Sequence, residues 1–241
     1  MNKYFIDAGT TYSKIIELTS DSFCETQNSL GSVVKKEENK NYYILPSKLL
    51  KKLDLRFEKA CGHMGSIKSV ANKAENEVIA LAKGCEKYVS DDVTVLDLGS
   101  RDAKWIRFVD GKFKDMDWNT SCASSTGATV EMLLKFYDVE LSQLSFSDEK
   151  FPVTCGIFGL ERIMDDISKG AEASESISKF IHGLAYNAWS FSRKPKKIFL
   201  SGGFCDNECF VESLKTYCEV EPLGRFLLCE GLIELGAENE N

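Results

Sequence analysis

Short runs of apolar residues, each followed by a small polar turn, mark the first part of the chain. Segment 3–18 holds two such runs on either side of a turn at Gly9, which predicts a β-hairpin. The same patterning predicts strands at 42–45 and 56–61. Apolar positions three and four residues apart then predict a helix over 76–88, with its buried side formed by Val78, Ile79, Leu81 and Ala82.

The order of strand, turn and strand returns in segment 93–119, where Asp110 and Gly111 form a second tight turn. In both segments the first strand ends in an aspartate, a glycine follows, and a lysine precedes the next apolar run. The sequence therefore predicts an internal duplication whose corresponding residues are Asp7 and Asp97, Gly9 and Gly99, and Lys14 and Lys104.

Helical spacing dominates the part of the chain that follows. It predicts helices over 126–137, 157–169 and 174–191, and then a strand over 197–201 that runs into Gly202 and Gly203. The buried sides predicted for the first two of these helices consist of Val130, Leu133, Leu134 and Tyr137, and of Leu160, Ile163, Met164 and Ile167.

Composition narrows the class of partner. The chain has 241 residues, 43% hydrophobic and 28% charged, which fits a folded α/β protein and excludes a disordered or fibrous one. Its formal charge of −7 favours a small-molecule or protein partner over nucleic acid or an anionic membrane. No apolar run approaches the roughly 18 residues of a membrane span, and Asp7 interrupts the start of any signal peptide, so we expect a cytoplasmic protein.

Nine cysteines and two histidines leave few options for a metal site. The cysteine number is odd and no Cys-x2-Cys pair occurs, which speaks against a disulfide framework and a self-contained zinc site. Packing, catalysis and metal binding remain open for individual cysteines. For Cys205 and Cys209, which are separated by three residues, packing is favoured over metal binding.

The first hairpin turn has the parts of a phosphate-binding loop. A glycine lets backbone N–H groups approach an anion, threonine hydroxyls donate to phosphate oxygens, and an aspartate can hold hydrated Mg²⁺. One such turn by itself favours a plain hairpin over a phosphate-binding loop. The second copy and the late Gly202-Gly203 pair favour a nucleotide site, and in this order the motifs resemble those of the actin, sugar-kinase and heat-shock-chaperone ATPase superfamily.

Two cysteine segments indicate a family within that superfamily. Segment 118–127, W-N-T-S-C-A-S-S-T-G, resembles the N-D-K-C-A-A-G-T-G motif of the activator ATPases of 2-hydroxyacyl-CoA dehydratases and benzoyl-CoA reductases. Segment 154–158, T-C-G-I-F, resembles that family's second cysteine motif. The resemblance extends from Asp7 to Gly231.

This resemblance implies an α/β fold of two ribonuclease-H-like subdomains, as in actin-like ATPases, with a nucleotide cleft between them. The expected subdomains are 1–91 with 222–241, and 92–221. Asp7 and Asp97 are expected to hold Mg²⁺ through water, and Asp102 is the candidate catalytic carboxylate. The residues expected to bind ATP or ADP are Gly9, Thr10, Thr11, Lys14, Gly99, Gly127, Gly202 and Gly203.

The resemblance also implies that Cys122 and Cys155 ligate one 4Fe-4S cluster shared across a homodimer. Each precedes a predicted helix, whose N-terminus favours a thiolate, and a two-fold axis would complete the four thiolates that a cubane cluster needs. The implied function is an ATPase that takes an electron from ferredoxin or flavodoxin and passes it to a partner iron-sulfur dehydratase or reductase.

Several positions depart from the family pattern. Arg101 stands where the family has glutamine, and Leu160 and Arg162 stand where its second motif has two glutamates. Thr120 and Ser121 replace the aspartate and lysine that precede the family's first cysteine. These departures keep two alternatives open: a small-molecule kinase with structural cysteines, and a nucleotide-sensing module without turnover.

Overall fold

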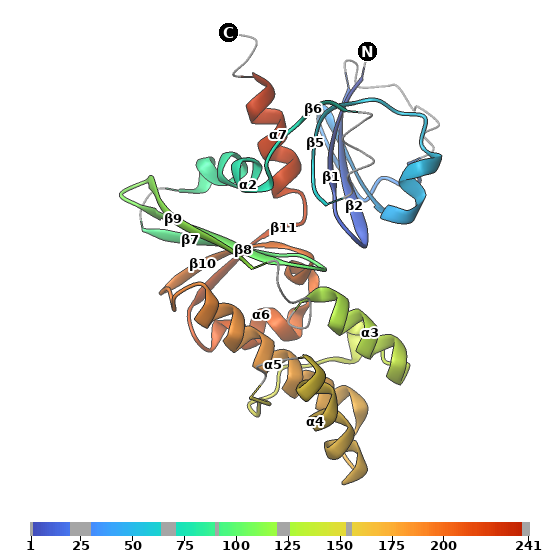
Figure 1. The fold of residues 1–241 in the computed structure, drawn as a ribbon, viewed down its shortest axis with the longest axis vertical. Coiled ribbons are helices and arrows are strands. Elements are labelled where there is room, and N and C mark those ends of the chain that lie inside the picture. The colour runs from blue at the N-terminus through green and yellow to red at the C-terminus, as the bar shows by residue number, and fades with distance from the viewer. Residues whose placement is uncertain are drawn as a thin grey trace. The chain divides into compact units, whose positions relative to one another are not determined.

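The computed structural model describes residues 2–19, 30–63, 71–89, 92–119, 126–152 and 156–237, and for Gly156 and Ile157 it describes the backbone alone. The chain divides into two compact units (Figure 1). Unit 1 comprises Met1–Tyr88 and Arg225–Asn241, and unit 2 comprises Val89–Gly224.

Unit 1 is built on a mixed sheet with the strand order β3-β4-β2-β1-β5-β6. β1 pairs antiparallel with β2 and β2 with β4, whereas β5 and β6 run parallel to β1. Helix α7 packs against β1, β2 and β5, and α2 packs against α7. The described elements are β1 (Lys3–Ala8), β2 (Tyr12–Leu18), β3 (Lys35–Glu37), β4 (Lys40–Pro46), the 3-10 helix η1 (Ser47–Lys52), β5 (Phe57–Cys61), β6 (Ala71–Ala74), α2 (Glu77–Cys85), the 3-10 helix η2 (Glu86–Tyr88) and α7 (Leu227–Ala237).

Unit 2 has the strand order β11-β10-β7-β8-β9. β7, β8 and β9 are antiparallel neighbours, and β10 and β11 run parallel to β7. Figure 1 shows α5 and α6 on one face of this sheet, where Phe180 and Phe210 enter the core beside Leu96 and Leu200. The described elements are β7 (Val93–Leu98), β8 (Ala103–Val109), β9 (Lys112–Asn119), α3 (Gly127–Tyr137), the 3-10 helix η4 (Leu141–Gln143), α4 (Gly156–Ser168), α5 (Ala173–Phe191), β10 (Lys197–Gly202), the 3-10 helix η5 (Gly203–Asp206), α6 (Glu208–Lys215) and β11 (Glu219–Gly224).

Both sheets share one topology. We number the strands of each sheet in chain order, starting from β1 in unit 1, where the outer β3 is left out, and from β7 in unit 2. In both sheets the strands then lie side by side in the order third, second, first, fourth, fifth. This is the ribonuclease-H-like arrangement, with the second strand antiparallel to the first, so the predicted α/β fold is confirmed. None of the described helices combines the length and apolar character that a membrane span requires.

The helices predicted from spacing are present, with ends that differ by at most three residues. Asn76 caps α2, because its side-chain oxygen accepts a hydrogen bond from the N–H of Val78. Two expected core positions are wrong: Ile79 is 50% exposed and Met164 is 45% exposed. Ile79 lies on the side of α2 opposite its buried residues, and Met164 lies at the edge of the buried side of α4.

A buried carboxylate in β2 anchors the sheet of unit 1. The side chain of Glu17 accepts hydrogen bonds from Asn2 at 2.7 Å, Tyr4 at 2.9 Å, Asn41 at 3.0 Å and Tyr43 at 2.7 Å. Burial alone would raise the pKa of Glu17, but these donors outweigh it and lower the pKa from 4.5 to about 2. The folded state therefore favours the ionised form of the Glu17 side chain.

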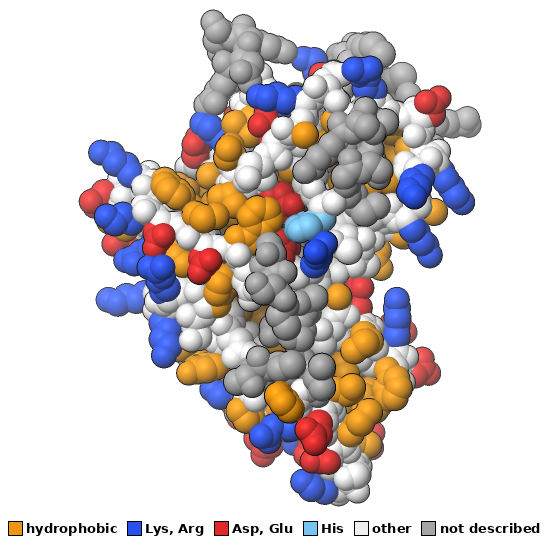
Figure 2. All heavy atoms as spheres, viewed as in Figure 1, with side chains coloured by type: hydrophobic (Ala, Val, Ile, Leu, Met, Phe, Trp, Pro, Cys, Tyr) orange, Lys and Arg blue, Asp and Glu red, His pale blue; other side chains and the backbone are white. Residues whose placement is uncertain are grey.

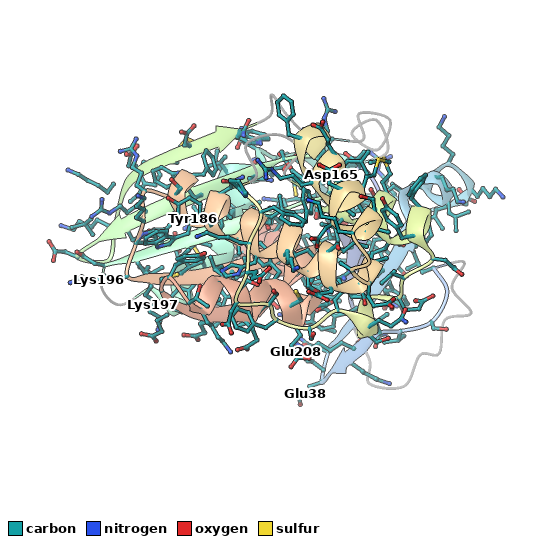
Figure 3. The ribbon with its side chains drawn as sticks, turned by 90° about the horizontal axis from the view of Figure 1, so that it is seen from below. Glu38, Asp165, Tyr186, Lys196, Lys197 and Glu208 are labelled. Carbon is teal, nitrogen blue, oxygen red and sulfur yellow. The ribbon has the colours of Figure 1, made fainter. Side chains whose placement is uncertain are left out.

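Unit 1 should accordingly lose stability in acid. Because the folded pKa lies below the unfolded one, the contribution of Glu17 is complete above pH 4.5 and disappears as the pH falls toward about 2. We expect Glu17→Gln to lower the free energy of unfolding by about 1–3 kcal/mol at pH 7 and to flatten its fall below pH 4.5. Urea unfolding between pH 7 and about pH 2 measures the free energy of unfolding and its dependence on pH. The control is Glu38→Gln at the exposed tip of the β3–β4 hairpin (Figure 3), and an equal effect of the two substitutions would contradict the prediction.

Candidate nucleotide and metal site

The hairpin of unit 1 places an aspartate and a lysine opposite each other. Asp7, at the end of β1, pairs in register with Lys14 of β2, and Lys14 Nζ lies 2.8 Å from Asp7 Oδ2. The Asp7 residue is 6% exposed, so this charge sits close to the protein interior beside the turn. Thr10 is exposed and Gly9 and Thr11 are half-buried, which leaves the predicted phosphate-binding turn at the surface of unit 1.

Ser47, which sequence reasoning missed, holds this turn from the start of η1. Its backbone N–H donates to Thr11 O at 2.8 Å, and its hydroxyl donates to Gly9 O at 2.7 Å. The same hydroxyl lies 2.8 Å from the hydroxyl of Ser13. The turn therefore has a fixed shape before any ligand binds.

Gly9→Val is expected to abolish nucleotide binding. A Cβ at position 9 would lie 2.6 Å from the backbone oxygen of Tyr12, which cannot swing aside as a flexible side chain could. The turn must then change shape, and its N–H groups lose their alignment on a phosphate. Calorimetry with Mg²⁺ and ATP measures the loss, while circular dichroism checks the fold.

Gly236→Ala is the matched control, since its added Cβ would meet its nearest neighbour, Phe5, at an ordinary 3.8 Å. It should bind nucleotide like the unmodified chain. Full affinity in Gly9→Val would place the phosphate site elsewhere.

A thiol from the C-terminal helix ties the two strands of this hairpin together. The N–H of Asp7 donates to Cys229 Sγ at 3.2 Å, and the thiol donates to Lys14 O at 3.2 Å. Cys229 is fully buried, and burial raises the pKa of its thiol. No local signal in the sequence revealed this contact of Cys229 with residues more than 200 positions away.

Unit 2 repeats the charge pairing in a more buried form. Asp97 of β7 pairs in register with Lys104 of β8, whose Nζ lies 3.2 Å from Asp97 Oδ2 and 3.4 Å from Asp102 Oδ2. The Ser201 hydroxyl of β10 donates to Asp97 Oδ1 at 2.7 Å. The two carboxylates thus share one ammonium group, and all four residues are buried. Hard oxygen ligands with an excess of negative charge suit a hydrated divalent cation.

The turn that follows Asp97 is fastened to the start of α3. The N–H of Gly127 donates to Gly99 O at 3.1 Å, the N–H of Ala128 donates to Ser100 O at 2.9 Å, and the Thr126 hydroxyl donates to the same oxygen at 2.6 Å. The structure therefore brings Gly99 and Gly127 together, and the first N–H groups of α3 hold the turn.

A glycine at the end of the fourth strand of each sheet permits a close backbone approach: Gly202 ends β10, and Gly62 directly follows β5. Gly202 has φ +93°, and a Cβ there would lie 2.3 Å from Leu98 O. Gly62, missed in the sequence, has φ +104°, and its Cβ would lie 2.4 Å from Ala8 O. The missing side chain lets the end of β10 lie against the end of β7 beside Asp97, and the end of β5 lie against the end of β1 beside Asp7. At Gly203, by contrast, a Cβ would enter open space, with no described neighbour within 4 Å.

The predicted cluster ligands Cys122 and Cys155 lie outside the described residues. In the sequence Cys155 directly precedes α4 and Cys122 precedes α3 by five residues. None of the described cysteines forms a disulfide. Burial raises the pKa of Cys85 to about 12 and of Cys218 to about 11, which disfavours their thiolates.

The thiols of the Cys-x3-Cys pair also point to separate partners. Cys205 donates to Leu200 O at 3.1 Å and Cys209 donates to Ser145 O at 3.2 Å. These contacts support the packing interpretation of the pair.

Comparison with known proteins identifies the family. No protein-family model matches the chain. The activator of lactoyl-CoA dehydratase from Anaerotignum propionicum is 30% identical over 192 residues, which cover 72% of each chain. The chain belongs to the activators of 2-hydroxyacyl-CoA dehydratases. The (R)-2-hydroxyglutaryl-CoA dehydratase activating ATPase of Acidaminococcus fermentans is 23% identical over 237 residues, 92% of this chain and 91% of that protein.

Solved structures of two relatives share the fold. The activator of the 2-hydroxyisocaproyl-CoA dehydratase from Clostridium difficile, with bound ADPNP, superposes with a TM-score of 0.75 at 19% identity and covers 100% of this chain and 98% of its own. Component A of the Acidaminococcus fermentans dehydratase gives a TM-score of 0.71 at 19% identity, covering 98% and 97%. The expected actin-like ATPase fold is thereby confirmed.

Proposed function

We propose that this chain is an ATP-dependent activator that passes a low-potential electron from a 4Fe-4S cluster to a partner 2-hydroxyacyl-CoA dehydratase or a related iron-sulfur reductase. The observation that carries the proposal is the pair of in-register hairpins, Asp7 with Lys14 and Asp97 with Lys104, in a member of this family. Ferredoxin or flavodoxin is the proposed electron source.

The nucleotide part of the proposal assigns roles by chemistry. Asp7 and Asp97 each offer a carboxylate to hydrated Mg²⁺, and Lys14 neutralises phosphate charge beside the turn. Asp102 is proposed to act at the γ-phosphate. The turn residues Gly9, Thr10 and Thr11 and the turn residues Gly99 and Gly127 are proposed to contact phosphate, and Gly202 and Gly203 are proposed to face adenosine.

The cluster part of the proposal requires two copies of the chain. Cys122 and Cys155 supply two thiolates, whereas a cubane cluster takes four, so a homodimer would complete the site. Figure 2 shows hydrophobic side chains gathered over α3. Large apolar side chains are exposed on the two helices that follow the cysteines: Met132, Phe136, Phe158 and Met164. Association would cover such side chains.

The cluster, when bound, supplies a one-electron redox centre. Nucleotide can drive the transfer only if it binds the donor-competent arrangement of the chain more tightly than the other arrangement. The fixed turns at Ser47 and at the start of α3 connect the proposed phosphate contacts to the core of each unit.

Anaerobic purification tests the proposal. The protein should be brown, contain about two iron atoms per chain, hydrolyse ATP, and sediment as a dimer that dissociates when the cluster is bleached. An iron-free chain that hydrolyses ATP would overturn the electron-donor function in favour of the small-molecule kinase. An iron-free chain that binds ATP without hydrolysis would leave the nucleotide-sensing module.

A further inference from the structure

Trp118 of β9 contacts the charged network of unit 2 directly. Its indole N–H donates to Asp102 Oδ2, and the ammonium of Lys104 lies 5.4 Å from the centre of its ring. Trp118 and Lys104 also face each other in register between β9 and β8. The half-buried tryptophan therefore touches both charged partners.

The three tryptophans of the chain differ in what their indole groups bind. Trp105 is fully buried, and its indole nitrogen has no hydrogen-bond partner among the described residues. Trp189 donates to the backbone oxygen of Pro195 at 3.0 Å. Trp118 donates to a carboxylate that belongs to the candidate nucleotide site.

The geometry of Asp102 depends on that hydrogen bond. Lys104 and Trp118 both engage Oδ2, so they fix one edge of the carboxylate. The other oxygen, Oδ1, lies 3.0 Å from the position that a Cβ on Gly99 would take. Holding Oδ2 therefore aims Oδ1 at the turn after β7, and the backbone oxygen of Asp102 closes that turn by accepting the N–H of Gly99 at 3.0 Å.

We propose that Trp118 is a positioning residue that orients the Asp102 carboxylate. Through this contact, the binding of a nucleotide at the turn after β7 would also affect β9. This inference rests on the proposed function for the identity of the ligand. A rigid donor suits the task, because an indole held in a sheet loses little conformational freedom when its N–H binds a carboxylate. In the sequence, β9 ends three residues before Cys122, so the same strand leads from the network to a proposed cluster ligand.

Indole N–H signals of the ¹⁵N-tryptophan-labelled protein test the hydrogen bond. Trp118→Phe, Trp105→Phe and Trp189→Phe assign the three signals. Asp102→Asn should shift the Trp118 signal and leave that of Trp189 in place, and Mg²⁺ with ATP should shift the Trp118 signal in the unmodified chain. A Trp118 signal that stays in place both in Asp102→Asn and on addition of Mg²⁺ with ATP would overturn the inference.

Steady-state kinetics test the positioning role. Trp118→Phe keeps the ring but removes the donor, so kcat for ATP hydrolysis should fall about tenfold or more, with a changed pH profile, while the Kd for ADP changes less than about twofold. Trp189→Phe should hydrolyse ATP like the unmodified chain. An unchanged rate and pH profile in Trp118→Phe would refute the positioning role. If the unmodified chain binds no nucleotide, the proposed function fails, and the response to Asp102→Asn still decides the hydrogen bond.

Discussion

Gly202→Ala is expected to destabilise unit 2 by about 3 kcal/mol or more. Gly202 adopts φ 93° and ψ −168°, a conformation open almost only to glycine, and an added Cβ would lie 2.3 Å from the backbone oxygen of Leu98. Backbone strain and steric overlap each cost about 1–3 kcal/mol. The parallel pairing that sets Asp97 beside Ser201 lies one residue away, so the charged network should also loosen.

Gly203→Ala supplies the matched control for this prediction. It is the next residue in the chain, but no atom of the described residues lies within 4 Å of the position its Cβ would take, so stability should remain within about 0.5 kcal/mol of the original. Urea unfolding of the two variants measures the difference. Equal stability of Gly202→Ala and Gly203→Ala would show that a side chain fits between β10 and β7 at position 202, and would contradict the prediction.

Cys122→Ala and Cys155→Ala should each yield a colourless protein with almost no iron. A cubane cluster needs four thiolates, and a shared site that loses one residue per chain loses two of its four ligands at once. Iron analysis and absorption spectra of anaerobically purified variants provide the measurement. Both variants should also sediment as monomers under conditions in which the unmodified chain is a dimer, because metal bound only by the assembled state stabilises that state.

Cys218→Ala controls for the loss of a cysteine as such. Its half-buried thiol has a pKa raised to about 11 by burial and should contribute nothing to a cluster, so this variant should keep its full iron content. Full iron in Cys122→Ala or in Cys155→Ala would refute the corresponding ligand assignment.

The periodic patterns predicted those elements whose burial follows from local spacing. Apolar residues at helical intervals located α3, α4 and α5, and the two strand-turn-strand segments located both hairpins. The matching positions of Asp7, Lys14, Asp97 and Lys104 were already readable in the chain, because a two-stranded hairpin sets its register through its own turn. The two cysteine motifs pointed to the family that the relatives then confirmed.

Local patterns failed where a residue acts through a distant segment. Ser47 supports the first hairpin from the start of η1, Gly62 supports it from directly after β5, and Cys229 contacts it from the C-terminal helix. Helix α6 was not predicted, because its eight residues are too few for a clear apolar period.

The sequence by itself determined the hairpins, the long helices and the order of the chemically active residues, since each depends on neighbours within a few positions. Tertiary structure alone decided which groups meet. The contact of Ser201 with Asp97 spans 104 residues. Such contacts arise only when strands from separate parts of the chain pair in one sheet, and that pairing depends on packing across the whole unit rather than on any local preference.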